Sequence, residues 1–346
     1  MEGNPKSVEI IGGGLAGLVA GLLLRRRGIP VHLREAASYP RHRVCGEFLC
    51  GLDESWIAEH NLGPMFSGAA RNRTCAWFLD SKLPFHTTEL PGPVLGISRF
   101  LLDQRLAESF AETGGKLSSG ERADLKPGEG KVIACGRPAG GPPKWVGLKA
   151  HLRGESLAAD LEVHLGRGGY IGLARIESGK VNACGLFPAA AFRSTGRDER
   201  KLVAAAGAIG LTNLACRLRD ANWDDSSVAG CAAASLGWQN KGNDASALAI
   251  GDAAAMIPPF TGNGMTMAIQ AGSAIVPHAE AWARGRISWP QAVARSRGEL
   301  HKEFQSRMRW SGLGHPMLLH PAGQRVVAWL ARTGLLPFHL LFRLTH

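Results

Sequence analysis

The feature that most constrains the fold is a glycine-rich turn near the N-terminus. Residues 12–17 are Gly-Gly-Gly-Leu-Ala-Gly, with the G-x-G-x-x-G spacing, and they directly follow the apolar run Val8–Ile11. The pattern predicts a buried strand over this run, a helix over Leu15–Arg27 and a second strand over Ile29–Arg34. A strand–helix–strand unit of this kind opens a doubly wound parallel sheet, so we expect an α/β fold.

Each glycine of the turn has its own physical role. Gly12 permits the tight bend, Gly14 lets a diphosphate approach the backbone, and Gly17 lets the helix pack closely on the strand. Glu35 follows the second strand, where its carboxylate can accept hydrogen bonds from a ribose and would repel a 2′-phosphate. The turn therefore predicts dinucleotide binding, and alone it fits NAD, NADP and FAD equally well.

A second Gly-Asp element lies far downstream, in residues 251–265. It follows the apolar run Ala247–Ile250, which predicts a further buried strand, and it leads into a predicted helix at Gly264–Ile275. Asp252 comes directly after that strand and is well placed for sugar hydroxyls, such as those of a ribityl chain. The positive end of the helix would stabilise the negative charge of a reduced flavin ring.

The turn between this aspartate and the helix suits a flat ring. Prolines at 258 and 259 stiffen the turn, and two glycines remove side chains where a ring would lie against the backbone. A ligand that reaches both motifs must be long, and FAD is such a ligand. The two motifs together predict that FAD is held by Gly12, Gly14, Leu15, Ala16, Gly17, Glu35, Gly251, Asp252, Pro258, Gly262, Asn263, Gly264 and Met265.

Segments of a different character interrupt the cofactor-binding pattern. Residues 74–88 and 145–186 alternate as strands of a half-buried sheet do, and the Ala-rich Arg200–Leu218 looks helical. We expect a discontinuous Rossmann-like FAD-binding domain with a parallel sheet, an inserted mixed β-sheet substrate domain and a helical C-terminal section. The predicted ranges are 1–72, 96–144 and 241–278 for the FAD-binding domain, 73–95 and 145–240 for the substrate domain, and 279–346 for the C-terminal section.

Composition excludes several other classes of protein. From the N-terminal residues we expect no signal peptide, no apolar run is long enough to span a bilayer, and the seven cysteines include no C-x-x-C pair. These features favour a reduced, cytoplasmic protein without a structural metal site. We see no nucleic-acid-binding signature beside the basic charge, so no nucleic-acid partner is expected.

The net charge of +11 is concentrated near the C-terminus. Residues 284–346 carry ten Lys and Arg against two Glu, a net charge of +8, and the last part is also rich in Leu, Val, Trp and Phe. An interfacial helical hairpin would give such a segment peripheral contact with the inner face of a membrane. The alternative is a helix pair that packs on its own domain or at a dimer contact.

Further motifs lie between the two glycine elements. They are Arg43-Val44-Cys45-Gly46-Glu47 and Ser98-Arg99 with Asp103. With these, the chain resembles the FAD-dependent oxidoreductases that include geranylgeranyl reductases and aromatic-hydroxylase-type (class A) flavoprotein monooxygenases. The resemblance implies that Arg43, Cys45, Gly46 and Arg99 line the flavin site and that NAD(P)H is a candidate reductant.

Two positions depart from the family pattern. Cys135 stands where the hydroxylases have the aspartate of an Asp-Gly pair, which disfavours NADPH-coupled hydroxylation. Gly172 stands where the reductases have the tryptophan of a Tyr-x-Trp-x-Phe-Pro strand, and its lack of a side chain would open the pocket. The Trp-x-Trp-x-Ile-Pro signature of flavin halogenases is absent.

The sequence thus predicts a flavoenzyme that acts on a hydrophobic, isoprenoid- or polyketide-like substrate, and it favours reduction of a double bond. Hydroxylation of an electron-rich ring with O2 is the alternative, and a membrane-surface flavoprotein carrier without its own substrate is a third. The candidate catalytic residues are Cys45, Glu47 and Tyr170. Cys45 would tune the flavin or donate a proton if Arg43 lowers its pKa. Glu47 would be a general acid or a partner of Arg41 or Arg43, and Tyr170 a pocket wall.

Overall fold

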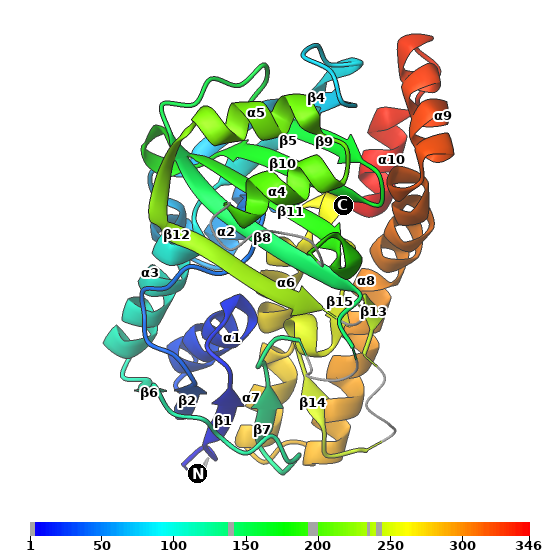
Figure 1. Cartoon of the computed structure of the whole chain (residues 1–346). Helices are drawn as coiled ribbons and strands as arrows, with labels where there is room; N and C mark the ends of the chain where they lie inside the picture. The colour runs from blue at the N-terminus through cyan, green and yellow to red at the C-terminus, as the bar shows by residue number, and fades with distance from the viewer. Residues whose placement is uncertain (1–3, 138–141, 193–199, 234–235, 240–243) are drawn as a thin grey trace.

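The computed structural model of the chain describes residues 4–137, 142–192, 200–233, 236–239 and 244–346. Two sheets dominate it, one above the other in Figure 1, with long helices along one side. The lower sheet is parallel and has the order β14-β7-β1-β2-β6. Its strands are β1 (Val8–Ile11), β2 (Val31–Glu35), β6 (Lys116–Ser119), β7 (Lys131–Ile133) and β14 (Leu248–Ala249).

The strand–helix–strand unit at the N-terminus is confirmed, with shifts of one or two residues at the element ends. Helix α1 (Leu15–Arg26) is buried along nearly its whole length, because two helices in particular pack on it. These are α3 (Arg99–Glu112) and α6 (Gly264–Ala274). A Cβ added at Gly272 of α6 would lie 2.5 Å from the Ala16 carbonyl oxygen, so the small residue sets how closely α6 approaches α1.

The second sheet is mixed and has eight strands in the order β12-β8-β11-β10-β9-β4-β5-β3. Among the described strands of this sheet, β4 and β9 alone pair in parallel. Most of its strands fall in the two segments predicted to be β-rich, and the expected boundary at residue 240 lies outside the described residues. The strands are β3 (Phe48–Leu49), β4 (Ala70–Phe78), β5 (His86–Gly96), β8 (Trp145–Arg153), β9 (Leu161–Gly166), β10 (Gly169–Arg175), β11 (Val181–Pro188) and β12 (Asn222–Ala233).

The two faces of this sheet have different surroundings. Ile171 and Leu173 of β10 are buried in a core with α4 (Lys201–Ala208) and α5 (Thr212–Asp220). Because side chains alternate along a strand, Tyr170 and Gly172 lie on the opposite face. The segment 200–218 is helical, as the sequence predicted, but it forms two helices, because Gly210, with φ +84°, has a conformation that a helix interior does not adopt.

Helices complete the chain. They are α7 (Val276–Ala283), α8 (Trp289–Leu319), α9 (Pro321–Arg332) and α10 (Phe338–Thr345). Helix α8 begins with a Ser288 capping box and packs against β14 of one sheet and β9 of the other, so it braces both. In the part of the chain that the structure describes, none of the helices combines the length and the apolar character needed to cross a bilayer. The short elements include helix α2 (Glu54–Glu59) and the strands β13 (Gly237–Trp238) and β15 (Ala255–Met256), which pair with each other.

Candidate cofactor and substrate site

A cavity of about 250 Å³, open to solvent, lies between the two sheets. Its lining contains residues from both glycine motifs, from the loop that precedes β3 and from the mixed sheet. Thirteen predicted site residues line it, namely Gly14, Leu15, Ala16, Arg43, Cys45, Gly46, Arg99, Tyr170, Gly251, Asp252, Gly262, Gly264 and Met265. The other predicted residues, Gly12, Gly17, Glu35, Glu47, Pro258 and Asn263, are not part of the lining.

The three glycines of the N-terminal turn differ in what surrounds them. Gly12 has φ +109°, and an added Cβ would lie 2.3 Å from the Ala134 carbonyl oxygen. A Cβ at Gly17 would lie 2.0 Å from the carbonyl oxygen of Gly12. At Gly14 the nearest atom would be the Arg99 Nη2 atom at 3.9 Å. Gly12 and Gly17 are therefore required by packing, whereas Gly14 leaves open space at the cavity.

Glu35 lies behind this turn and holds its shape. Its carboxylate accepts a hydrogen bond of 2.7 Å from the Gly13 amide, and it pairs with Arg41 at 2.7 Å and with Arg43 at 3.4 Å. Arg43 also lies 3.4 Å from Asp103, to which Arg99 donates two hydrogen bonds of 2.7 Å. The pairing of Glu47 with Arg41 or Arg43 that the sequence suggested is therefore wrong, because Glu35 takes both arginines.

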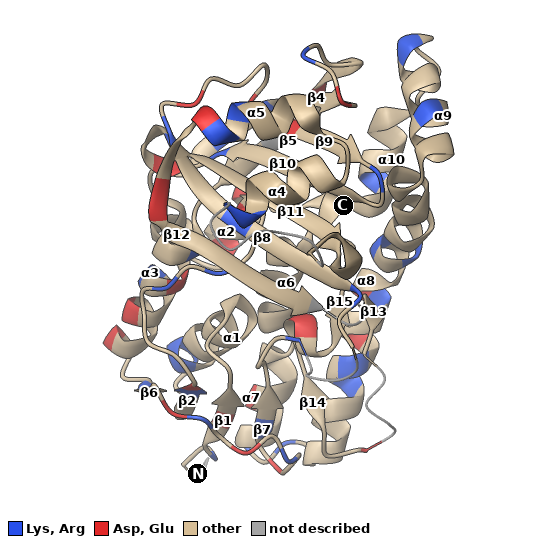
Figure 2. Cartoon of the chain, viewed as in Figure 1, with Lys and Arg blue, Asp and Glu red and all other residues tan. Residues whose placement is uncertain are grey.

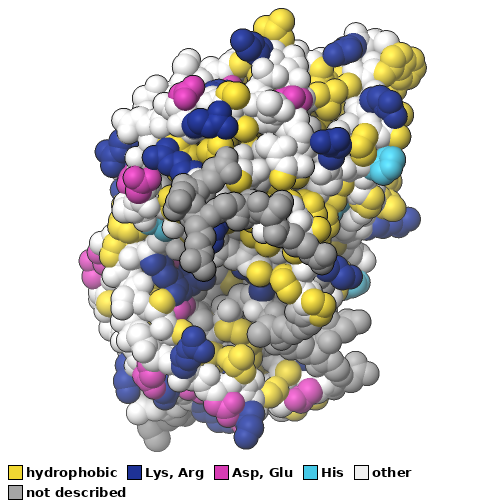
Figure 3. All heavy atoms as spheres, in the orientation of Figure 1, with side chains coloured by type: hydrophobic (Ala, Val, Ile, Leu, Met, Phe, Trp, Pro, Cys, Tyr) yellow, Lys and Arg dark blue, Asp and Glu magenta, His cyan; other side chains and the backbone are white. Residues whose placement is uncertain are grey.

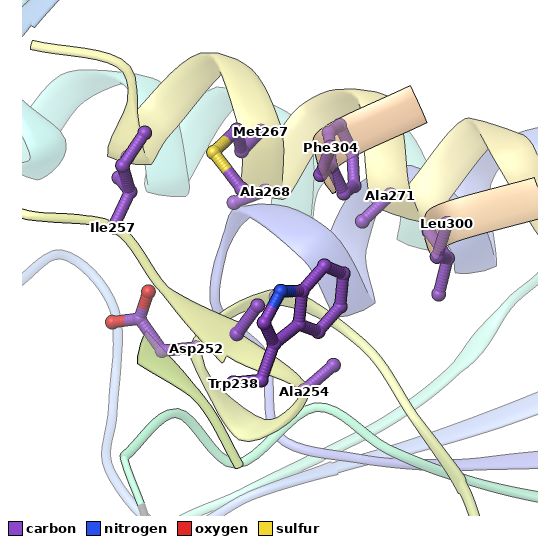
Figure 4. Close-up of a pocket in the computed structure, with 12 residues that line it drawn as sticks. Trp238, Asp252, Ala254, Ile257, Met267, Ala268, Ala271, Leu300 and Phe304 are labelled. Atoms are coloured by element: carbon purple, nitrogen blue, oxygen red, sulfur yellow. The ribbon is translucent and has the colours of Figure 1, made fainter. Parts of the chain in front are cut away.

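Asp252 borders the cavity at the end of β14. Figure 4 shows its carboxylate pointing away from a small apolar pocket that contains Trp238 and Phe304. The carboxylate has no hydrogen-bond partner among the described residues. Burial raises the pKa of Asp252, because its effect exceeds that of the positive charges of Arg137 and Arg99, which lower the pKa. A half-buried acid without a partner is ready to accept hydrogen bonds from a ligand hydroxyl.

The turn before α6 is built differently from the expectation. The flat ring that meets Gly262 belongs to Phe48, since a Cβ at this glycine would lie 2.0 Å from that ring. Asn263 is buried and donates to the carbonyl of Thr345. Pro258 caps a short 3₁₀ turn. The start of α6, at Gly264 and Met265, does line the cavity, and α6 has no side-chain cap on its first amides.

The Cys45 thiol is not activated in the way that the sequence suggested. It lines the cavity, but burial raises its pKa, and the positive charge of Arg99 does not outweigh that effect. The thiol is therefore protonated at neutral pH. The Asn182 amide fixes the loop at this point by donating hydrogen bonds of 2.9 and 2.8 Å to the carbonyls of Cys45 and Gly46.

Glu47 points away from the cavity into a buried ion cluster. Its carboxylate lies 2.6 Å from Lys149 Nζ and 2.6 Å from His151 Nε2, and it accepts a bond of 3.0 Å from the Arg99 amide. Burial opposes its ionisation, but the hydrogen bond from His151 and the charge of Lys149 hold the pKa of Glu47 below its ordinary value. Lys149 and His151 were not singled out in the sequence, since each is an isolated polar residue in a strand.

The wall of the cavity on the mixed sheet is apolar and rich in small residues. Tyr170 is buried in this wall, where burial raises the pKa of its phenol well above the ordinary value. Gly172 lies beside it, and a Cβ there would meet nothing closer than 3.8 Å. The lining residues that the sequence did not indicate include Phe48, Arg137, Gly147, Val163, Cys184, Gly185, Leu186, Cys231, Met256 and Phe260.

The open space at Gly172 can be filled to test whether this wall of the cavity binds the substrate. Gly172→Trp is expected to weaken binding of an alkylphenol probe at least about 10-fold while FAD binding is unchanged, because the indole would fill the pocket. Probe binding is followed by its effect on the absorbance of bound FAD. Gly172→Ala is the matched control and should resemble the parent protein. Equal probe affinity of the Trp variant and the parent protein would contradict the assignment.

The residues present fit FAD. The first amides of α1 have no side-chain cap and adjoin the open space at Gly14, which suits a diphosphate. The unpartnered Asp252 suits a sugar hydroxyl, and the first turn of α6 adjoins the same cavity. None of the described residues form a group of three or more His, Cys, Asp or Glu that could hold a metal ion.

Comparison with known proteins supports the fold. No family model matches the chain, and no curated protein matches its sequence. Among solved structures it is similar to PqsL, a probable FAD-dependent monooxygenase from Pseudomonas aeruginosa, with 17% identity, a TM-score of 0.70, and coverage of 96% of this chain and 99% of that one. It is also similar to the flavin-dependent brominase Bmp2, with 15% identity, a TM-score of 0.75 and coverage of 98% and 92%.

A third solved structure extends this likeness. The chain is similar to 2-methyl-3-hydroxypyridine-5-carboxylic acid oxygenase in its tetrameric form, with 17% identity, a TM-score of 0.70 and coverage of 99% of this chain and 97% of that one. The chain therefore has the fold of flavin-dependent monooxygenases, and the predicted fold class is confirmed.

Proposed function

We propose that this chain is an FAD-dependent monooxygenase that hydroxylates an electron-rich ring of a hydrophobic substrate, with NAD(P)H as the reductant. The observation that carries the proposal is the single cavity that joins Gly14 and Asp252 to the apolar wall at Tyr170 and Gly172. The names of the similar structures support oxygenation over reduction, which reverses the order of the two functions favoured by the sequence.

FAD held at Gly14, Asp252 and the start of α6 would supply the redox chemistry. The chain's own residues bind and orient. The apolar wall at Tyr170 and Leu186 would hold the substrate and keep water out. In the overall reaction one atom of O2 enters the ring, the other leaves as water, and both electrons come from NAD(P)H.

Reduction of a double bond remains the second candidate, because of the position of Cys45. Its thiol lines the cavity and keeps its proton at neutral pH, so it can donate a proton to a substrate carbon after hydride addition. The hydroxylation proposal assigns no such step to this residue.

Turnover with and without O2 separates the two functions. The purified protein with FAD is given NAD(P)H and a panel of hydrophobic phenols, polyketide-like compounds and isoprenoids, and substrate-stimulated NAD(P)H oxidation is measured. For a monooxygenase, product requires O2 and gains one ¹⁸O atom from ¹⁸O2. If product forms under anaerobic conditions and contains no additional oxygen atom, hydroxylation is overturned and the reductase is favoured.

A further inference from the structure

The C-terminal helices expose large apolar side chains that none of the described residues cover. Trp310, Leu313 and Met317 recur at spacings of three and four residues, which places them on one face near the end of α8. Helix α9 exposes others on the face opposite its buried residues Gln324, Ala328 and Ala331. The exposed apolar surface, called here the C-terminal face, comprises Trp310, Leu313, Met317, Val326, Trp329, Leu335, Leu340 and Leu341.

The charge of this region has a single sign. Residues 304–346 contain five arginines and no aspartate or glutamate. Figure 2 shows basic but no acidic residues on α9, and Figure 3 shows basic side chains interspersed with hydrophobic ones at the upper right, where Figure 1 places α9 and α10. Arg325, Arg332 and Arg343 are all exposed. Trp and Leu mixed with arginine suit the boundary between lipid headgroups and acyl chains.

We propose that the C-terminal face docks on an anionic lipid surface. Several large apolar side chains exposed on neighbouring helices mark an interaction site. The positive charge of the C-terminal face favours a lipid surface over a second copy of the chain. A second copy would place cationic residues against cationic residues, whereas an anionic bilayer attracts each arginine near its surface. Because α9 and α10 are short, the helices lie in the headgroup region and do not cross the bilayer.

The docked helices also adjoin the candidate site. The His346 ring lies 2.8 Å from the carbonyl oxygen of Thr261, and Asn263 donates to the carbonyl of Thr345. Both contacts fall on the turn before α6, whose next residues line the cavity. Lipid docking would therefore place the site close to a bilayer that dissolves hydrophobic substrates. The docking itself goes beyond the proposed function and is tested without turnover.

Cosedimentation with vesicles tests the proposal. The full chain with FAD is mixed with vesicles of phosphatidylcholine alone or of phosphatidylcholine with phosphatidylglycerol. We expect strong, salt-sensitive binding to the anionic vesicles and weak binding to the neutral ones. Trp329→Ser with Leu340→Ser should lower the affinity at least about 10-fold. Arg325→Gln with Arg332→Gln should lower it about 10- to 30-fold and reduce the dependence on salt.

The matched control is Leu125→Ser, which changes an exposed leucine in the loop between β6 and β7, at the opposite end of the molecule from α9. This variant should bind vesicles like the parent protein, and circular dichroism should show all variants folded. Unchanged binding of both C-terminal variants would overturn the proposal. A second result would also overturn the proposal. If the parent protein does not bind vesicles but forms a dimer in sedimentation velocity, and Trp329→Ser with Leu340→Ser dissociates that dimer, the C-terminal face binds a second copy of the chain.

Discussion

Lys149→Met is expected to lower the free energy of unfolding by about 3–5 kcal/mol, because it removes the buried ammonium that pairs with the Glu47 carboxylate and leaves that carboxylate with hydrogen bonds from His151 and the Arg99 amide alone. Lys149 and Glu47 are 1% and 0% exposed, and their charged atoms are 2.6 Å apart. The change removes the ammonium and keeps most of the aliphatic stem, so the loss of packing is small. Urea denaturation followed by tryptophan fluorescence measures the effect.

The double variant Glu47→Gln with Lys149→Met is the control. Since it removes both charges, it should be clearly more stable than Lys149→Met alone. If the loss of stability in the double variant equals the sum of the losses in Glu47→Gln and Lys149→Met, the two residues are not coupled. The pKa of Glu47 is lower in the folded protein than in the unfolded chain. The contribution of Glu47 to the free energy of unfolding is therefore complete above the unfolded pKa and is lost as the pH falls through the folded pKa. The parent protein should therefore lose more stability on acidification than the double variant.

Local signals predicted the parallel sheet well. The glycine turn requires its own geometry within a few residues, as the close approach of Gly17 to the Gly12 carbonyl oxygen shows, so β1, α1 and β2 follow from short-range chemistry. The mixed sheet depends on distant pairing. The parallel contact between β4 and β9 joins residues more than 80 positions apart, and no local pattern encodes that choice of neighbour. The helical segment over 200–218 was predicted, but its division into α4 and α5 at Gly210, which takes a positive φ, was not.

The same division applies to the site. Gly14, Asp252 and Gly264 were predicted from motifs in which the residues act near one another, and all three line one cavity. Glu47 was given the wrong partners because its actual side-chain partners, Lys149 and His151, lie more than 100 positions away. A lysine inside an alternating strand gives no sign that it is buried. Only the packing of β8 against the loop at Cys45 shows it.

Gly14→Val is expected to weaken FAD binding at least about 100-fold, equivalent to about 2.7 kcal/mol, while the protein remains folded. The prediction rests on the proposed FAD site. Gly14 has φ −84° and ψ −176°, an extended conformation that valine adopts readily, and its Cβ would meet only Arg99 at 3.9 Å. The branched side chain would then occupy the space in front of α1 that a diphosphate needs.

Titration of the FAD-free protein with FAD, followed by flavin fluorescence, measures the loss, and thermal unfolding checks the fold. Gly12→Ala separates the two effects, since its Cβ would collide with the Ala134 carbonyl oxygen at 2.3 Å and disrupt the turn itself. Gly128→Val, at a glycine with open surroundings outside the cavity, should bind FAD like the parent protein. A folded Gly14→Val protein that keeps full FAD affinity would show that the diphosphate does not lie at this turn. The glycine motif would then serve packing alone, as Gly12 and Gly17 already do.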